Sequence, residues 1–303
     1  MITDDIAVFL DFARHCAADF GPPTARAAFL VSPDGFARAE QSAADNRYMA
    51  QAAQFDTVRA LQQHRELHRQ LSTELPVVVF PGDPATPDSV FPNNVFATVR
   101  GRLLVGRMRH PVRQREAQRQ DIRGFFHDLL GYALEDLSLQ PHPCELTGSL
   151  VIDRARGLGL CGLSERCDRA GAERMHRAFG LRATLVFDLA PGEYHANVVL
   201  EVLAGRALVA SPRGFAQPQV AEALAGFYAP HASLLDPVEQ QAFAANAIAL
   251  GPHRTWMSAV AERALAAPTR AMLERAGLPP TGVELDAIEV AGGSLRCCVA
   301  EIF

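Results

Sequence analysis

The chain has 303 residues, of which 49% are hydrophobic and 21% charged, and its net charge is −5. This composition is typical of a soluble globular protein. The mild acidity argues against binding to nucleic acid or to an anionic membrane. No apolar run is long enough to cross a bilayer, and the first residues lack the features of a signal peptide. We therefore expect a cytoplasmic protein with no membrane or nucleic-acid partner.

The cysteines and histidines do not form a recognisable ligand set. Six cysteines occur, at positions 16, 144, 161, 167, 297 and 298, without a CxxC pair, and free thiols are expected in a reducing compartment. His64 and His68 have a spacing that can bind zinc, but no third ligand accompanies them. Glycine loops that bind nucleotide phosphates are absent as well. The sequence therefore predicts no cofactor and no metal.

Hydrophobic periodicity predicts alternating strands and helices along the whole chain. In chain order, the predicted helices are 4–18, 56–73, 113–131, 168–179, 218–228 and 256–276. The predicted strands are 27–31, 77–80, 94–99, 102–108, 148–153, 159–163, 184–188, 196–203, 206–211, 283–291 and 295–302. Strand pairs alternate with single helices about five times, which indicates a repeated unit arranged in a ring. No linker divides the chain, so we expect one domain over residues 1–303, with 1–24 as a helical extension.

The final segment places a thiol beside a predicted strand. Residues 295–302 are bulky and alternate in polarity, which predicts a strand with Cys297 near its start. Gly292 and Gly293 before it permit a close approach of the backbone to a ligand. On a strand, Cys297 and Cys298 would point to opposite faces, so only one of them can face a given cavity. A free cysteine alone is more often an inert core residue than a nucleophile.

Four other segments carry polar residues where a predicted strand meets a loop, a place where binding residues concentrate. These segments are 87–96 with Asp88, Asn93 and Asn94, 145–149 with Glu145, 162–172 with Arg166, and 194–199 with His195. Each one alone is typical of a turn or a helix cap. Together, an acid, a histidine and a distant cysteine form the set expected of covalent thiol catalysis.

Taken in order, these segments resemble the guanidino-group-modifying (pentein) superfamily. The similar motifs are Asp-x-x-x-x-Asn-Asn, Glu-x-Thr-Gly-Ser, Gly-Leu-Ser-x-Arg, Tyr-His-x-Asn-Val and Gly-Gly-Ser-x-Arg-Cys. The amidinotransferase-related group that includes citrulline hydrolases and arginine dihydrolases is particularly similar, and dimethylarginine dimethylaminohydrolases are also members of the superfamily. The resemblance covers residues 27–303. It implies an α/β fold, a five-bladed propeller of ββαβ units with pseudo-fivefold symmetry, which agrees with the repeat.

The resemblance also implies a role for each candidate residue. Cys297 would be the nucleophile and His195 the general acid and base, while Glu145 and Asn94, with Asn93 beside it, would contact the nitrogens of a guanidino or ureido group. Arg166 would bind the substrate carboxylate, and Arg113 is a candidate for a second carboxylate-binding arginine. Asp88 would lie near the α-amino group, and residues 32–47 would form a lid.

The Asn93–Asn94 pair departs from many relatives, which have Glu-Asp there. A carboxylate only accepts hydrogen bonds, whereas an amide both donates and accepts, so it can hold guanidino nitrogens and afterwards a ureido oxygen. This substitution favours a second hydrolysis. We therefore expect a hydrolase that converts citrulline or arginine to ornithine, ammonia and carbon dioxide through a covalent adduct of Cys297.

Other functions remain open from the sequence. A single hydrolysis of the arginine deiminase or dimethylargininase type is one alternative, and an amidinotransferase is another. A propeller that binds an amino acid without catalysis, and a redox sensor built on Cys297 and Cys298, are further alternatives. The expected partner is a small amino-acid substrate, and a homodimer is left open.

Overall fold

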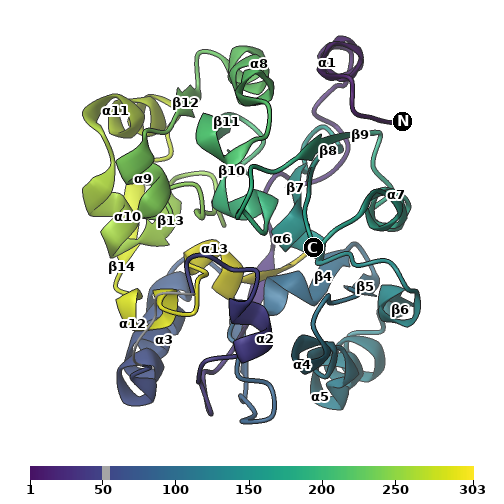
Figure 1. The fold of residues 1–303 in the computed structure, drawn as a ribbon, viewed down its shortest axis with the longest axis vertical. Helices are drawn as coiled ribbons and strands as arrows, with labels where there is room; N and C mark the ends of the chain where they lie inside the picture. Colours follow the sequence, from purple (N-terminus) through teal and green to yellow (C-terminus); the bar gives the residue numbers. More distant parts are fainter. Residues whose placement is uncertain (50–54) are drawn as a thin grey trace.

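The computed structural model describes residues 1–49 and 55–303, which form five separate β-sheets. Figure 1 shows these sheets around a common centre, with helices at the outside, among them α3 (Thr57–Leu71), α7 (Arg169–Ala178) and α8 (Pro218–Tyr228). The inner ends of the sheets therefore converge on the middle of the molecule.

Three of the sheets share one strand order, a hairpin followed by a third strand parallel to its second strand. They are β4 (Phe96–Val99), β5 (Arg102–Val105) and β6 (Ala133–Asp136); β7 (Leu150–Asp153), β8 (Leu158–Leu163) and β9 (Ala183–Asp188); and β10 (Leu200–Leu203), β11 (Ala207–Ala210) and β12 (Ala232–Leu234). The antiparallel pairs need only a tight turn, but a parallel strand needs a crossover, which a helical segment supplies in each case.

The other two sheets complete the ring. In one of them β13 (Thr255–Ser258) pairs in parallel with β14 (Pro280–Val283). In the other, β2 (Ala27–Val31) pairs in parallel with β3 (Val77–Phe80) and antiparallel with β15 (Ala300–Ile302). The last strand of the chain thus pairs with β2, near its beginning. A short strand, β1 (Ile2–Thr3), extends the sheet of β9.

The remaining helices are short, and several lie directly before a strand. They are α1 (Ile6–Arg14), α2 (Glu40–Ala43), α4 (Pro111–Gln114), α5 (Gln120–Gly124), α6 (Leu146–Ser149), α9 (Pro237–Gln241), α10 (Ala259–Ala264), α11 (Ala267–Arg275), α12 (Asp286–Glu289) and α13 (Leu295–Cys298), with 3₁₀ turns η1 (Pro92–Asn94), η2 (Glu116–Gln118), η4 (Leu137–Leu139), η5 (Ala196–Val198) and η6 (Pro212–Gly214) and a π-helical turn, η3 (Phe125–Leu129).

Several predicted elements are confirmed, and others are wrong in specific places. The strands 27–31 and 77–80 and the helix 218–228 have the predicted bounds. The predicted helix 256–276 instead begins as strand β13 and continues as two helices. The predicted strand 283–291 ends at Val283, where α12 follows after a short gap. Strands β6 and β12 were not predicted.

Aromatic packing joins neighbouring sheets in the core. The ring of Phe29 on β2 lies 5.5 Å from those of Phe80 and Phe126 and 6.3 Å from that of Phe96, measured between centroids. Such edge-to-face pairs add to the burial of the rings themselves. They hold the sheet of β2 against the sheet of β4. In the described part of the chain, no helix has the length and apolar character that a membrane crossing requires.

Candidate active site

One polar residue lies just before the first strand of each unit, close to the centre of the molecule. Asn94 ends η1 before β4, Glu145 precedes α6 and β7, and His195 precedes η5 and β10. Cys297 lies in α13 before β15, and Asn246 precedes Ile248, which bridges to Trp256 of β13. These five residues follow one another at intervals of 51, 50, 51 and 51 positions. The repeat therefore delivers one side chain per unit to the same place.

Most of the predicted site residues line one small cavity. Asp88, Asn94, Arg113, Arg166 and Cys297 contribute to its wall, and the space left between them is only about 10 Å³. The side chains are almost entirely covered, since Cys297 is 1% exposed. Met49 and Phe91 form an apolar part of the cavity wall. A space of this size holds little more than one water molecule, so an amino acid can enter only if part of the wall moves.

Glu145 and His195 form a fully buried pair beside this cavity. The imidazole Nε2 lies 2.8 Å from Glu145 Oε2, and the backbone N–H of Arg109 donates to Oε1. Burial opposes ionisation of Glu145, but Arg166 and the bond from His195 hold its pKa down, at about 2. An ionised carboxylate only accepts, so Nε2 must donate.

The tautomer that follows leaves Nδ1 of His195 as a hydrogen-bond acceptor. Burial lowers the pKa of this histidine, which keeps the ring neutral. Nδ1 is buried, and none of the residues 1–49 and 55–303 bonds to it. A neutral imidazole fixed by a carboxylate, with a free ring nitrogen, is the arrangement of a general base.

Gly148 sets the distance between Asn94 and His195. A Cβ atom at this position would lie 2.4 Å from Asn94 Oδ1 and 2.7 Å from His195 Cε1, closer than such atoms approach. The glycine of the Glu-x-Thr-Gly-Ser motif therefore has a steric reason to be there. It allows side chains from two different units to approach the backbone between them.

Cys297 lies in a helical turn and not in a strand, which corrects the sequence-based expectation. The N–H groups of Cys297 and Cys298 bond to the carbonyl of Ser294 at 3.0 and 3.3 Å, and β15 begins only at Ala300. Cys298 is buried in the apolar core. Burial raises the pKa of Cys297, and raises that of Cys298 well above its ordinary value. Of the two cysteines, Cys297 is the one that lines the cavity.

Two amide side chains contact the sulfur of Cys297. Asn246 Nδ2 lies 3.2 Å from Sγ and Asn197 Nδ2 lies 3.6 Å from it. Asn197 belongs to the Tyr-His-x-Asn-Val motif, but Asn246 was missed in the sequence, where it looked like an ordinary turn residue. The interval of about 50 residues between the other four groups is the feature that identifies it.

Arg166 connects the cavity to residues 32–47. Its Nη2 donates to Asp45 Oδ1 at 2.5 Å and to the carbonyl of Ser42 at 3.0 Å, and its guanidinium lies 4.9 Å from the ring centroid of Tyr194. Asp45 is also 2.8 Å from His110 Nε2. Arg166 Nε is buried and bonds to no residue that the structure describes. Segment 32–47, which contains α2, therefore lies against the site.

Arg113, the second predicted carboxylate-binding arginine, is already paired. Its guanidinium bonds to both oxygens of Glu116, at 2.8 and 2.9 Å, and to the carbonyl of Phe91. Burial raises the pKa of Glu116 to about 7 despite this contact. Asp88, whose pKa burial also raises, has a buried Oδ1 to which no described residue bonds. Arg166 Nε and Asp88 Oδ1 are thus unused polar atoms of residues that line the cavity.

Asn93 is placed differently from its neighbour. Its amide Nδ2 donates to Thr147 Oγ1 at 3.3 Å, and the Thr147 hydroxyl donates to the carbonyl of Asn93. It is buried but is not part of the cavity wall. The geometry makes Asn93 a link between the turns that carry Asn94 and Glu145.

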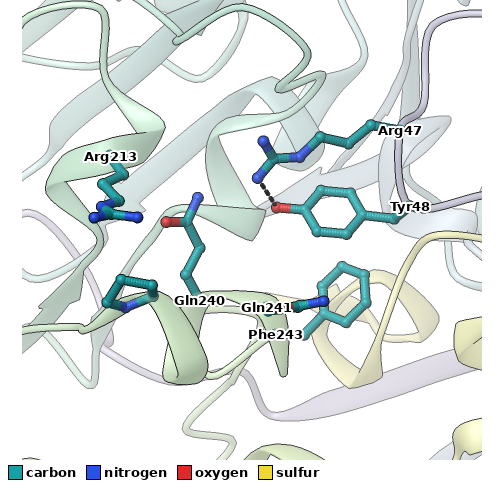
Figure 2. A pocket seen from close by; sticks show the side chains of 7 residues that line it. Arg47, Tyr48, Arg213, Gln240, Gln241 and Phe243 are labelled. Atoms are coloured by element: carbon teal, nitrogen blue, oxygen red, sulfur yellow. Dashed lines mark hydrogen bonds between the residues drawn. The ribbon is translucent and has the colours of Figure 1, made fainter.

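A second, open hollow lies beside the cavity (Figure 2). Arg47, Tyr48, Arg213 and Gln240 line it, with the Tyr48 hydroxyl and the Arg47 guanidinium 2.9 Å apart. Behind them, the buried carboxylate of Glu193 accepts bonds from Arg47, from Tyr48 and from Gln240. These contacts fasten the segment that follows Asp45 to the body of the protein.

Charged and sulfur side chains elsewhere do not form a metal centre. Over the described ranges 1–49 and 55–303, no group of three or more His, Cys, Asp or Glu is placed to hold an ion. His64, one of the pair noted in the sequence, is buried, and burial lowers its pKa to about 4.

The solved structures of known proteins show which fold this is. The N-terminal domain of ArgZ, an arginine dihydrolase from the Ornithine-Ammonia Cycle in Cyanobacteria, superposes in its substrate-bound form with a TM-score of 0.78 and 18% identity, over 91% of this chain and 97% of that one. Against full-length ArgZ, at 19% identity and the same TM-score, the chain covers 40% of its length and 91% of its own. A dimethylarginine dimethylaminohydrolase adduct with S-methyl-L-thiocitrulline gives 0.69 and 19%, over 91% and 99% of the two chains.

Sequence comparison identifies the family. Among proteins of curated function, none matches the sequence. Residues 32–303, most of the chain, match the family described as N,N dimethylarginine dimethylhydrolase, eukaryotic. The chain therefore belongs to this family, a family of carbon–nitrogen bond hydrolases within the pentein superfamily.

Proposed function

We propose that this protein hydrolyses a free amino acid with a guanidino or ureido group, using Cys297 as the nucleophile and no cofactor. The products from citrulline would be ornithine, ammonia and carbon dioxide; arginine would consume two waters and release two molecules of ammonia. One observation carries the proposal: Cys297 and Asn94 line a closed cavity beside the buried His195–Glu145 pair. Separate units of the fold contribute these four residues.

The nucleophile in this scheme is the thiolate of Cys297. The carbon of a guanidinium is a weak electrophile, because three nitrogens share the positive charge; a thiol does not attack it, but a thiolate does. Burial raises the pKa of Cys297, so little thiolate exists in the free protein. A cationic guanidino group in the same cavity favours the ionised sulfur, so the binding of arginine would activate the nucleophile.

His195 would move the protons. Its Nδ1 accepts a proton from the thiol or from water, and the imidazolium then protonates the departing ammonia. Glu145 stabilises that imidazolium and fixes the ring through the 2.8 Å contact with Nε2. Water then attacks the S-linked adduct, with His195 acting as the base, and the thiolate is released.

Arg166 and Asp88 would hold the amino-acid end of the substrate. Arg166 Nε and Asp88 Oδ1 are buried polar atoms without a bond to any described residue, and such atoms are costly unless a ligand or water satisfies them. An arginine suits a carboxylate and an aspartate suits an ammonium group. Arg113 would attract the substrate carboxylate by its charge alone, because its Nε and Nη2 already bond to the two oxygens of Glu116.

Asn94 favours hydrolysis beyond the first step. Its Oδ1 is buried and no residue in the described ranges bonds to it, so its amide is available to a ligand. An amide accepts from guanidino nitrogens and donates to a ureido oxygen, whereas a carboxylate would repel that oxygen. The Asn93 carbonyl and Thr147 fix the turn beneath it.

A single hydrolysis of dimethylarginine is the second candidate, and family membership favours it. The two candidates differ in product, because the second reaction stops at citrulline.

In either case we propose that residues 1–303 act as one catalytic domain with the pentein five-bladed propeller fold. The five sheets and the 50–51-residue interval support this symmetry. Residues 32–47 would be the lid.

The test is to incubate the purified protein with arginine, citrulline and N-methylated arginines and to assay ornithine, citrulline, ammonia and methylamines. Ornithine from citrulline supports the leading proposal, and citrulline plus dimethylamine supports the second candidate. No turnover of any of them would exclude both, and transfer to an added amine would indicate an amidinotransferase.

The nucleophile is tested with two neighbouring variants. Cys297→Ser should reduce turnover by at least about a thousandfold, because a serine hydroxyl is far less acidic than a thiol. Cys298→Ser, one residue away in the core, should retain much of the activity. Mass spectrometry of quenched reactions should find an adduct on Cys297 in the parent. The opposite pattern for the two variants would move the nucleophile to Cys298.

A further inference from the structure

We propose that Asn246 is a positioning residue that donates a hydrogen bond to the thiolate of Cys297 and fixes the direction of its sulfur. The proposal rests on Cys297 being the nucleophile but not on the identity of the substrate. Neither the sequence motifs nor the roles implied by the superfamily resemblance include Asn246.

The geometry ties both ends of the Asn246 amide to the nucleophile. Its Nδ2 lies 3.2 Å from Cys297 Sγ, and its Oδ1 accepts the backbone N–H of Cys297 at 3.3 Å. The same Nδ2 donates to the carbonyl of Asn197 at 2.8 Å. The backbone carbonyl of Asn246 accepts the N–H of Arg296. One residue thus holds the backbone and the sulfur of α13 together.

Burial makes such a donor necessary for an ionised sulfur. Cys297 is 1% exposed and Asn246 is fully buried, so water contributes little to stabilising the negative charge. A buried charge without hydrogen-bond donors is strongly unfavourable. The second amide, of Asn197, can accept the S–H of the neutral thiol through Oδ1 at 3.7 Å. The Nδ2 of Asn197 lies 3.6 Å from the sulfur and that of Asn246 only 3.2 Å, so Asn246 is the nearer donor to a thiolate.

The repeat supports the assignment independently. Asn246 occupies the position, 51 residues after His195 and 51 before Cys297, at which each other unit delivers a group to the site. The other four members are the residues proposed to bind substrate or to react with it. The fifth member has its amide directed at the sulfur.

Other charged groups around Cys297 do not replace this donor. Arg296, beside it in α13, bonds to Glu201, to Glu301 and to the carbonyl of Val299. Glu301 therefore offsets its charge, whereas burial raises the pKa of Glu201 to about 8, so Glu201 contributes a neutral hydrogen-bond partner at neutral pH. Tyr194 and the thiol of Cys298 face the sulfur as neutral groups with raised pKa values. Asp88, Arg113 and Arg166 belong to the wall of the same cavity, and each of the arginines has its own carboxylate partner.

The experiment measures the ionisation of Cys297 without substrate. The rate of alkylation by iodoacetamide is followed from pH 6 to 11, and labelled Cys297 is quantified by peptide mass spectrometry. In Asn246→Ala and in the isosteric Asn246→Asp, the midpoint, the pH at which the alkylation rate reaches half its maximum, should rise by about one pH unit or more. The reason is the loss of a hydrogen bond to a charged group. The value of kcat/KM near neutral pH should fall about tenfold for each unit.

Tyr228→Phe is the matched control, since it removes one buried hydrogen bond, to Asp153, far from the cavity. Its midpoint should equal that of the parent. Equal midpoints in the parent and in a folded Asn246→Asp would overturn the proposal, whatever happens to turnover. A protein with no hydrolase activity that still shows the shift would refute the proposed function and leave this inference standing.

Discussion

At the scale of single residues, Gly148 offers a direct test of the site geometry. In Gly148→Ala the added methyl group would collide with Asn94 Oδ1 and with His195 Cε1, which belong to two different units. Displacement of reacting groups by about 1 Å costs about a hundredfold in rate. We therefore expect kcat/KM to fall at least about a hundredfold in steady-state assays, while circular dichroism shows the parent fold.

The same substitution in an open position provides the control. Gly226 lies in α8, and a Cβ atom there would contact nothing within 4 Å. Gly226→Ala should keep full activity and raise the free energy of unfolding by about 0.5–1 kcal/mol, the usual gain in a helix interior. Full activity in Gly148→Ala would show that Asn94 and His195 do not need their present separation.

At this scale the sequence was informative wherever the chemistry of a side chain is unusual. Cys297, His195 and Glu145 stood out because a thiol, an imidazole and an acid follow one another at strand–loop junctions. Asn246 did not, because an asparagine in a turn is common and its partner is a sulfur 51 residues away. The buried ion pair of Arg113 with Glu116 could not be predicted either, because the sequence does not distinguish a buried i,i+3 pair from an exposed one.

At the scale of elements, one carboxylate of segment 32–47 connects it directly to Arg166 of the site. Asp45 bonds to Arg166 and to His110, and although burial opposes its ionisation, these two partners lower its pKa to about 2. In Asp45→Asn the charge-assisted bonds weaken. We expect KM to rise about tenfold with little change in kcat, measured by steady-state kinetics, because segment 32–47, the proposed lid, would lose part of its attachment to Arg166.

Glu40→Gln is the control for this variant, since Glu40 lies on the same segment with a side chain that is 79% exposed. Its kinetics should equal those of the parent. A fall in KM for Asp45→Asn would instead mean that Asp45 competes with the substrate carboxylate for Arg166.

Element boundaries were the weakest part of the sequence-based interpretation, for identifiable reasons. The apolar residues of 256–276 suit a helix, but Thr255–Ser258 pairs with β14 and Pro268 lies in the first turn of a new helix. Near Cys297 the alternation suited a strand, yet the Ser294 carbonyl closes a turn first. At Thr255–Ser258 a tertiary contact that local propensity does not contain decided the outcome, whereas at Cys297 a local backbone turn did.

At the scale of the whole molecule, a buried acid at the centre should make stability depend on pH. Glu201 bonds to Arg296, and burial raises its pKa from 4.5 to about 8. Between these values the folded protein keeps a proton that the unfolded chain releases, so the free energy of unfolding falls as the pH rises. Glu201→Gln removes this group and should make the fall from pH 5 to pH 8 smaller by roughly 1–3 kcal/mol.

Urea unfolding of the parent and of Glu201→Gln at pH 5, 6.5 and 8 measures the effect. Parallel stability curves for the two proteins would show that Glu201 ionises at its ordinary value. Glu40→Gln, remote from the centre, should leave the slope with pH unchanged.

The ring of sheets itself was predictable, because strand pairs and helices recur along the chain. Which strands close it was not, since β15 and β2 lie far apart in sequence and no local pattern specifies that they pair. Contacts of this kind depend on the complete arrangement of the units.

The interval of about 50 residues has one more consequence. Each repeat carries one polar residue of the candidate site, Asn94, Glu145, His195, Asn246 or Cys297, on a turn outside its strands. A substitution at one such turn can therefore change the ligand specificity of the site, while the strand packing of the other repeats is unchanged. A fold of this kind can acquire new chemistry through single amino-acid substitutions.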